Sequence, residues 1–137
     1  MIERLNSAEP WFYALLRIVT GFLFMWHGTQ KIFGVPGDQP PAQIASRFGA
    51  AGVIELVCGA LIAIGLLTRL AAFIASGEMA FAYFIAHAPN GFLPILNRGE
   101  LAVLYCFVFL YMVFRGSGIV AVDQLFTKTA ARAPART

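Results

Sequence analysis

Four long apolar stretches, separated by polar or turn-forming segments, dominate the pattern of this chain. They cover residues 11–33, 51–67, 70–88 and 99–114. Each approaches the roughly 20 residues that a helix needs to cross a bilayer. The second and fourth are short and would need tilt or local thinning of the bilayer. The pattern predicts an all-α fold, an integral membrane four-helix antiparallel bundle over residues 1–126.

The segments between these stretches predict where the helices begin and turn. Pro10 suits the start of the first helix, because proline is well tolerated at the first helical position. "GVPGDQPP" and "PNGFLP" are turn-forming, and "AQIASRFGAAG" predicts a short interfacial helix. Thr68 and Arg69 form a tight turn, which predicts that the second and third helices are antiparallel neighbours. The basic tail, residues 127–137, is predicted to be disordered and cytoplasmic.

The composition supports a membrane protein. The chain is 59% hydrophobic and only 12% charged, whereas soluble domains carry about 25% charged residues. So little charge cannot cover a water-exposed surface, so we expect the lipid bilayer to be its main surroundings. The net charge of +3 comes from basic residues that mostly flank apolar segments, and it does not indicate nucleic-acid binding. The N-terminus lacks the features of a cleaved signal peptide.

The positions of lysine and arginine predict the orientation. Six basic residues belong to one side, which holds both termini and the 67–70 turn: Arg4, Arg69, Arg115, Lys128, Arg132 and Arg136. Three belong to the other side: Lys31, Arg47 and Arg98. The excess favours a multi-pass protein of a bacterial-type inner membrane with both termini in the cytoplasm.

Several ionisable residues lie within the apolar stretches or at their ends, where each costs roughly 2.5–3.5 kcal/mol on insertion scales. At about 1.5 Å of rise per residue, most of them fall in the outer half of the predicted bundle. The candidate site is made of these residues: Arg17, His27, Lys31, Glu55, Glu78, His87 and Glu100. Arg17 alone falls in the inner half, where Glu78 is the acid we expect within reach.

Two interpretations of this cluster remain open at this stage. The charges could pair to hold four helices in register, with Lys31 and Arg98 reaching the surface. Alternatively, Glu55, Glu78 and His27 could line a pocket for a quinone head group, an anion or a proton. An unpaired acid in a low dielectric favours its protonated form, which makes Glu78 a candidate proton carrier.

Small residues and cysteines complete the pattern. Gly21 and Gly28 fall on one line of the first helix and predict close approach of a neighbouring helix. Cys58 and Cys106 are either a redox pair or, more commonly for buried cysteines, small hydrophobic residues. Since no metal-ligand spacing and no recognised catalytic motif is found, no metal site is predicted and the catalytic residues stay unknown.

Three stretches resemble the DoxX-like family of membrane proteins: "LLRIVTGFLFMWHGTQKIFG", "GVIELVCGALIAIGLLTRLAAFIASGEMAFAYFIAHAPNGF" and "NRGELAVLYCFVFLYMVFRGSGIVAVDQLF". The usual Gly-Pro-Gly is Gly116-Ser117-Gly118 here, and Ala121 replaces a typical serine. The family includes a small membrane subunit of a thiosulfate:quinone oxidoreductase, and other members are linked to thiol and oxidative-stress protection alongside soluble partners. The resemblance implies that the seven candidate residues form a polar site.

Two functions follow as hypotheses. The first is a membrane subunit, rather than a stand-alone enzyme, that docks a soluble or membrane oxidoreductase and presents quinone in the pocket. The second is a non-enzymatic scaffold or small-solute carrier whose charges are structural pairs. Because four helices make only a small bundle, a carrier would need a homo-oligomer.

Overall fold

The computed structural model describes residues 2–126, and all of its regular structure is helical. The elements are α1 (Ile2–Phe33), α2 (Arg47–Ile64), α3 (Thr68–Ala82), the π-helical turn η1 (Tyr83–His87), the 3-10 turn η2 (Ala88–Asn90), α4 (Pro94–Asn97) and α5 (Glu100–Arg115). No strand is present in this part of the chain. The predicted all-α class is confirmed.

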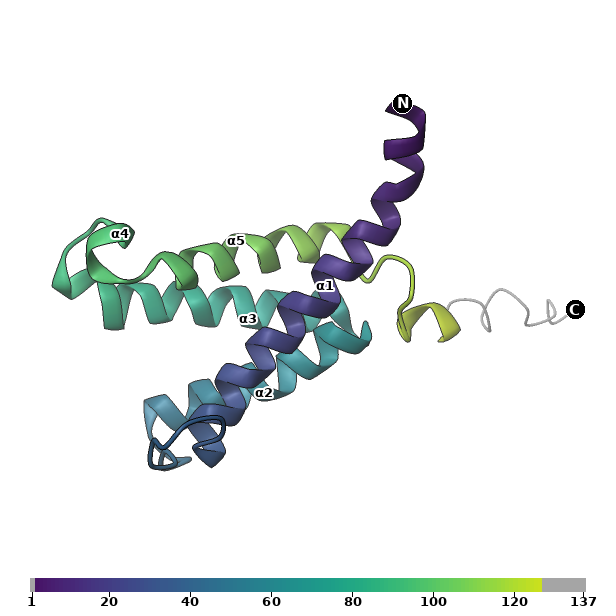
Figure 1. Ribbon diagram of the computed structural model, residues 1–137. Helices are drawn as coiled ribbons and strands as arrows, with labels where there is room; N and C mark the ends of the chain where they lie inside the picture. Colours follow the sequence, from purple (N-terminus) through teal and green to yellow (C-terminus); the bar gives the residue numbers. More distant parts are fainter. Residues whose placement is uncertain (1, 127–137) are drawn as a thin grey trace, which may run out of the picture.

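The four long helices form two antiparallel pairs (Figure 1). Helix α1 packs along α2, and α3 packs along α5. The turn after α2 lies at residues 65–67, whereas Thr68 and Arg69, the predicted turn, begin α3. Helices α2 and α3 are neighbours, as the sequence predicted. The α1/α2 pair crosses the α3/α5 pair at a clear angle, which differs from the simple up-and-down bundle that was predicted (Figure 1).

Glycines bring α1 and α2 into backbone contact. A Cβ on Gly28 would lie 2.3 Å from the Leu56 nitrogen, and one on Gly59 would lie 2.5 Å from the Met25 nitrogen. A Cβ on Gly21 would in turn lie 2.8 Å from the Gly59 carbonyl oxygen. Since real Cβ atoms are not found this close to backbone, only glycine permits this approach. The predicted close contact of the glycine line in α1 is confirmed.

Aromatic side chains fill the wider space between α1 and α5. Phe24 is fully buried, and its ring centroid lies 5.3 Å from that of Tyr105 and 4.7 Å from that of Phe109. Aromatic pairs in this range add to the energy of simple burial. Between α3 and α5, the Ser76 hydroxyl donates to the Cys106 carbonyl over 2.8 Å. The two helix pairs are therefore joined by the aromatic contacts between α1 and α5 and by the direct packing of α2 against α3.

The helix boundaries differ from the predicted ones at the ends of α1 and α2. Helix α1 begins at Ile2, and Pro10 lies inside it, because the preceding residues favour helix and a proline removes only one backbone hydrogen bond.

Helix α2 begins at Arg47, where the Ser46 hydroxyl accepts from the Gly49 nitrogen. No helix forms over residues 42–46, so the predicted interfacial helix is wrong there. Helix α2 ends at Gly65, whose φ of 72° suits glycine.

A network of side chains closes the end of the molecule that holds the α2–α3 turn and both ends of the described chain. The Arg17 guanidinium donates to the carbonyls of Ile62 (2.6 Å), Ala63 (2.8 Å) and Val120 (2.6 Å). Arg69 donates to the carbonyls at the end of α5, and the Tyr13 hydroxyl donates to Gly116. Asp123 accepts from the first backbone nitrogens of α3. We call Tyr13, Arg17, Arg69 and Asp123 the termini-side network.

Replacing Asp123 with alanine is expected to destabilise the protein moderately. Its carboxylate oxygens accept from the nitrogens of Leu67 (2.8 Å) and Thr68 (3.3 Å), so it acts as a cap of α3 supplied from a distant segment. Loss of such a cap costs about 1 kcal/mol, which thermal unfolding of the detergent-solubilised protein measures. Asp38→Ala, in an exposed loop, is the matched control, and equal melting of the two variants would contradict this role.

The outer surface of the molecule is apolar. Large exposed side chains include Leu70, Phe73, Phe84, Leu104 and Phe107 on the outward faces of α3, η1 and α5. By length and composition, the helical segments Arg47–Ile64 and Thr68–Asn90 could each cross a membrane. An apolar exterior over a core that holds fully buried polar groups such as Arg17 is typical of membrane proteins.

Candidate functional site

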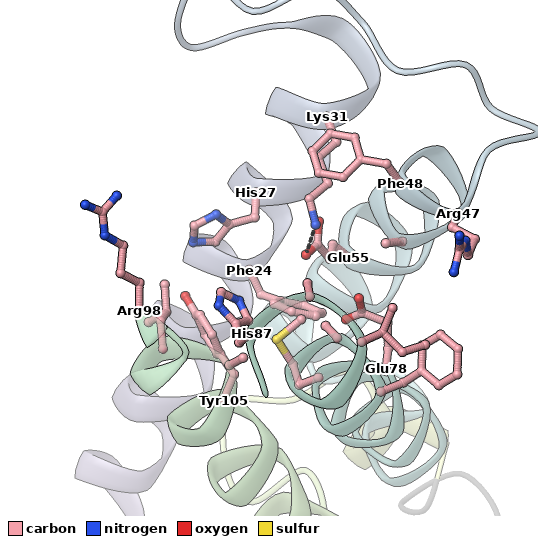
Figure 2. Close-up of a pocket in the computed structure, with 18 residues that line it drawn as sticks. Phe24, His27, Lys31, Arg47, Phe48, Glu55, Glu78, His87, Arg98 and Tyr105 are labelled. Atoms are coloured by element: carbon pink, nitrogen blue, oxygen red, sulfur yellow. Dashed lines mark hydrogen bonds and ion pairs between the residues drawn. The ribbon is translucent and has the colours of Figure 1, made fainter. Parts of the chain in front are cut away.

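A cavity of about 490 Å³ lies at the end of the molecule opposite the termini-side network. Helices α1, α2, α3 and α5 and the turn η1 all contribute to it (Figure 2). Its ionisable and polar lining residues are His27, Lys31, Arg47, Glu55, Glu78, His87, Arg98 and Tyr105. Most of the remaining wall is apolar and includes Phe24, Phe48, Met79 and Phe81. This combination of apolar walls with a few polar groups is usual for small-molecule sites.

An ion pair links α1 and α2 at one wall of the cavity. The Lys31 ammonium lies 2.6 Å from Oε1 of Glu55. The Glu55 side chain is only 3% exposed and that of Lys31 20%. The ammonium also lies 5.0 Å from the centroid of the Phe48 ring, a cation–π contact. Because the pair is largely removed from water, its two charges interact more strongly than those of a surface pair.

Glu78 approaches the same wall from α3 (Figure 2). It is half-buried and lines the same cavity as Glu55 and Lys31. Its Oε2 atom is inaccessible to water and has no hydrogen-bond partner among residues 2–126, and the same is true of Oε2 of Glu55. The wall therefore holds two carboxylates and one ammonium.

The opposite wall carries imidazole and phenol groups. The His27 ring on α1 lies edge-on to Tyr105 on α5, with 6.0 Å between ring centroids. His87 belongs to the π-helical turn and stacks on Tyr83, while its Nδ1 is 3.1 Å from the Asn97 carbonyl oxygen. Such π-helical turns recur at functional sites. The turn sets the position of His87 on the cavity wall.

Asn97 holds together the segment between η1 and α5. It is buried, its amide donates to the Gly91 carbonyl over 2.6 Å, and its side-chain oxygen accepts from the Gly99 nitrogen over 2.8 Å. The neighbouring Arg98 adopts a left-handed conformation with φ of 60°. This geometry places the exposed Arg98 side chain at the edge of the cavity, across from Arg47 (Figure 2).

The structure brings five of the seven predicted site residues to the cavity: His27, Lys31, Glu55, Glu78 and His87. It places Arg17 and Glu100 elsewhere. The expected contact between Arg17 and Glu78 does not form, because the Arg17 guanidinium binds backbone carbonyls in the termini-side network. Glu100 is exposed. Leu101 faces the cavity, and a helix turns by about 100° per residue, which directs Glu100 away.

Sequence reasoning missed three contributors. Arg98 was interpreted as an interfacial residue only, and Arg47 only as a topology signal, yet both line the cavity. Tyr105 was not among the predicted site residues. Tyr105 lies one helical turn after Leu101, and its hydroxyl needs polar surroundings within an otherwise apolar helix. That need was the signal in the sequence that Tyr105 faces a polar site.

The cysteines do not form a bond with each other. Cys58 is buried and Cys106 is half-buried, and both thiols are free. The Ser76 hydroxyl lies 3.6 Å from the Cys106 sulfur. Within the described residues, no group of three or more histidine, cysteine or acidic side chains is arranged to hold a metal ion.

Together, the apolar exterior, the helical fold and the polar cavity define a helical membrane protein with an internal polar site. The DoxX family model matches residues 12–88, which include α2, α3 and five cavity-lining ionisable residues that were predicted. The chain belongs to the DoxX family.

Relatives extend over nearly the whole chain. An uncharacterized Haemophilus influenzae protein is 45% identical over 133 residues, covering 93% of this chain and 99% of the relative. An uncharacterized membrane protein of Mycobacterium tuberculosis is 31% identical, covering 96% and 91%. A Bacillus subtilis protein with the name "Putative oxidoreductase CatD" is 26% identical, covering 83% and 86%. No solved structure matches significantly.

Proposed function

We propose that this DoxX family protein is a membrane subunit that supports quinone- or thiol-linked redox chemistry, with quinone as the substrate we favour. In this proposal all four long helices cross a bacterial-type inner membrane and both termini are cytoplasmic. The cavity then lies in the outer half of the bundle. The termini-side network would face the cytoplasm, which agrees with Arg69 and Arg115 lying at that end.

The single observation that carries this proposal is the chemistry of the cavity. A volume of about 490 Å³ falls within the range of ligand pockets. Aromatic and aliphatic side chains would contact a quinone ring and the start of its tail. His27, Lys31 and Tyr105 supply polar hydrogens at separate points of the wall, and quinone oxygens accept such hydrogens.

The reaction needs a second protein. Reducing a quinone to a quinol takes two electrons and two protons. In this proposal the electrons come from a partner oxidoreductase. The cavity residues would bind and orient the quinone and exclude water. The name of the Bacillus subtilis relative supports a link to redox chemistry.

The binding test uses the purified protein in nanodiscs with a short-chain ubiquinone and a short-chain menaquinone. We expect saturable binding of at least one. In Tyr105→Phe the affinity should fall about tenfold, because a lost hydrogen bond costs about 1.4 kcal/mol. Tyr111→Phe changes an exposed tyrosine of the same helix outside the cavity, so its affinity should be unchanged. Absence of saturable binding would refute the quinone site.

The Lys31–Glu55 ion pair favours a second function, a non-enzymatic scaffold or small-solute carrier. A buried pair that is already hydrogen-bonded needs no ligand. In that case Lys31→Met would lower the melting temperature strongly while no quinone stabilises the wild type. Quinone-dependent stabilisation of the wild type would instead favour the redox subunit.

A further inference from the structure

The charges of Lys31, Glu55 and Glu78 on the cavity wall do not balance. Glu55 and Glu78 each carry a carboxyl group, and one ammonium, that of Lys31, is paired with Glu55. With both acids ionised, the three groups together carry one net negative charge. In a setting of low dielectric, such an excess charge is expensive unless a cation or a proton compensates it.

Two oxygens at this wall show the missing compensation directly. Oε2 of Glu55 and Oε2 of Glu78 are both closed to water and have no hydrogen-bond partner within residues 2–126. The Glu55 side chain is 97% buried, since it is 3% exposed. Neither atom therefore has a neighbouring group that stabilises a negative charge, whereas a proton needs little additional space.

The other ionisable groups that face these acids do not supply the balance. These groups are His27 of α1, Arg47 of α2, His87 of η1, Arg98 between α4 and α5, and Tyr105 of α5. Arg47 and Arg98 are exposed, and the described residues contain no ion pair from either to Glu55 or Glu78. His87 Nδ1 is engaged with the Asn97 carbonyl. Lys31 is thus the cation in direct contact.

We propose that Glu55 and Glu78 hold one exchangeable proton between them against the single charge of Lys31, so that the cavity is a proton-binding site. The three groups are neutral when this proton is bound. Because the Lys31 ammonium is bonded to Glu55, Glu78 is the acid that carries the proton in this arrangement. This property depends only on the three side chains and stands whether or not quinone is the substrate.

Infrared difference spectroscopy of the protein in nanodiscs, without quinone, tests the proposal. At neutral pH the wild type should show the C=O stretch of one protonated carboxylic acid, which shifts in D₂O and disappears at high pH. Glu55→Gln and Glu78→Gln should each abolish this band, because one carboxylate and Lys31 then balance. Glu100→Gln, an exposed acid outside the cavity, should retain it.

Lys31→Met gives the opposite change. Without the ammonium, both acids should be protonated, and the band should have about twice the wild-type amplitude. Helical circular dichroism would confirm that each variant is folded. The proposal is overturned if the wild type lacks the band, if Glu100→Gln abolishes it, or if Na⁺ at constant pH removes it, since a metal ion would then be the compensating cation. Failure of quinone binding would leave all these results unchanged.

Discussion

Replacing Gly28 with alanine is expected to separate α1 from α2 and to lower the free energy of unfolding by about 3 kcal/mol. The added methyl would lie 2.3 Å from the Leu56 nitrogen and 2.6 Å from the Gly52 carbonyl oxygen. Both are backbone atoms of a regular helix, so they cannot rotate away as a flexible side chain could. Overpacking of this kind costs about 1–3 kcal/mol, and backbone displacement places this site at the upper limit.

Thermal unfolding in a mild detergent measures the effect of Gly28→Ala. Gly77→Ala is the matched control, because it makes the same chemical change in α3, where a Cβ would meet nothing within 4 Å. The control should melt at or slightly above the wild-type temperature, since alanine favours helix over glycine by about 1 kcal/mol. If the two variants melt together, the tight α1/α2 contact does not contribute as described.

Replacing Arg17 with methionine is the second change with a large expected effect. The guanidinium is fully buried and donates to three carbonyls, those of Ile62, Ala63 and Val120. Hydrogen bonds that involve a charged group contribute about 1.5–3 kcal/mol each, so loss of the three bonds is expected to cost at least about 3 kcal/mol. Val120 also has a positive φ of 54°, which is unfavourable for a β-branched residue and is held in place by this contact.

Arg17→Lys and Arg115→Gln are the two controls for Arg17→Met. The first tests the geometry of the guanidinium, and the second tests the loss of an exposed arginine. A lysine keeps the charge but lacks the planar fork that reaches several carbonyls, so its melting temperature should lie between those of wild type and Arg17→Met. Arg115 pairs with Glu9 at 2.6 Å on the exposed surface, where ion pairs contribute little. Arg115→Gln should therefore melt like wild type. Equal stability of Arg17→Met and wild type would refute the structural role of Arg17.

The helical class could be predicted because it depends on local pattern. Long apolar stretches separated by glycine and proline predict helices whatever their neighbours are, and the confirmed contact at Gly28 followed from residue size alone. The start of α1 was not predicted correctly. Pro10 predicted a helix start, but the structure has Pro10 inside α1, because the rest of the helix outweighs the energetic cost of one interior proline.

The candidate site was predictable in composition but not in full. Depth along each helix correctly grouped His27, Lys31, Glu55 and Glu78 at one end, because rise per residue is fixed. Depth says nothing about the direction of a side chain around the helix axis. For this reason Glu100 was included although it is exposed, and Tyr105 was omitted although it lines the cavity.

The sequence by itself determined that this chain is an apolar, all-helical protein with ionisable residues concentrated toward one end of its helices. Hydropathy and helical rise are properties of each segment alone, so they need no tertiary information. Only the tertiary structure decided that Arg17 binds backbone carbonyls and that Lys31 pairs with Glu55, while Oε2 of Glu78 has no hydrogen-bond partner in residues 2–126. The Arg17 and Lys31 contacts depend on how α1 packs against α2, and the position of Glu78 depends on how the two helix pairs cross. Contacts between distant segments fix both arrangements.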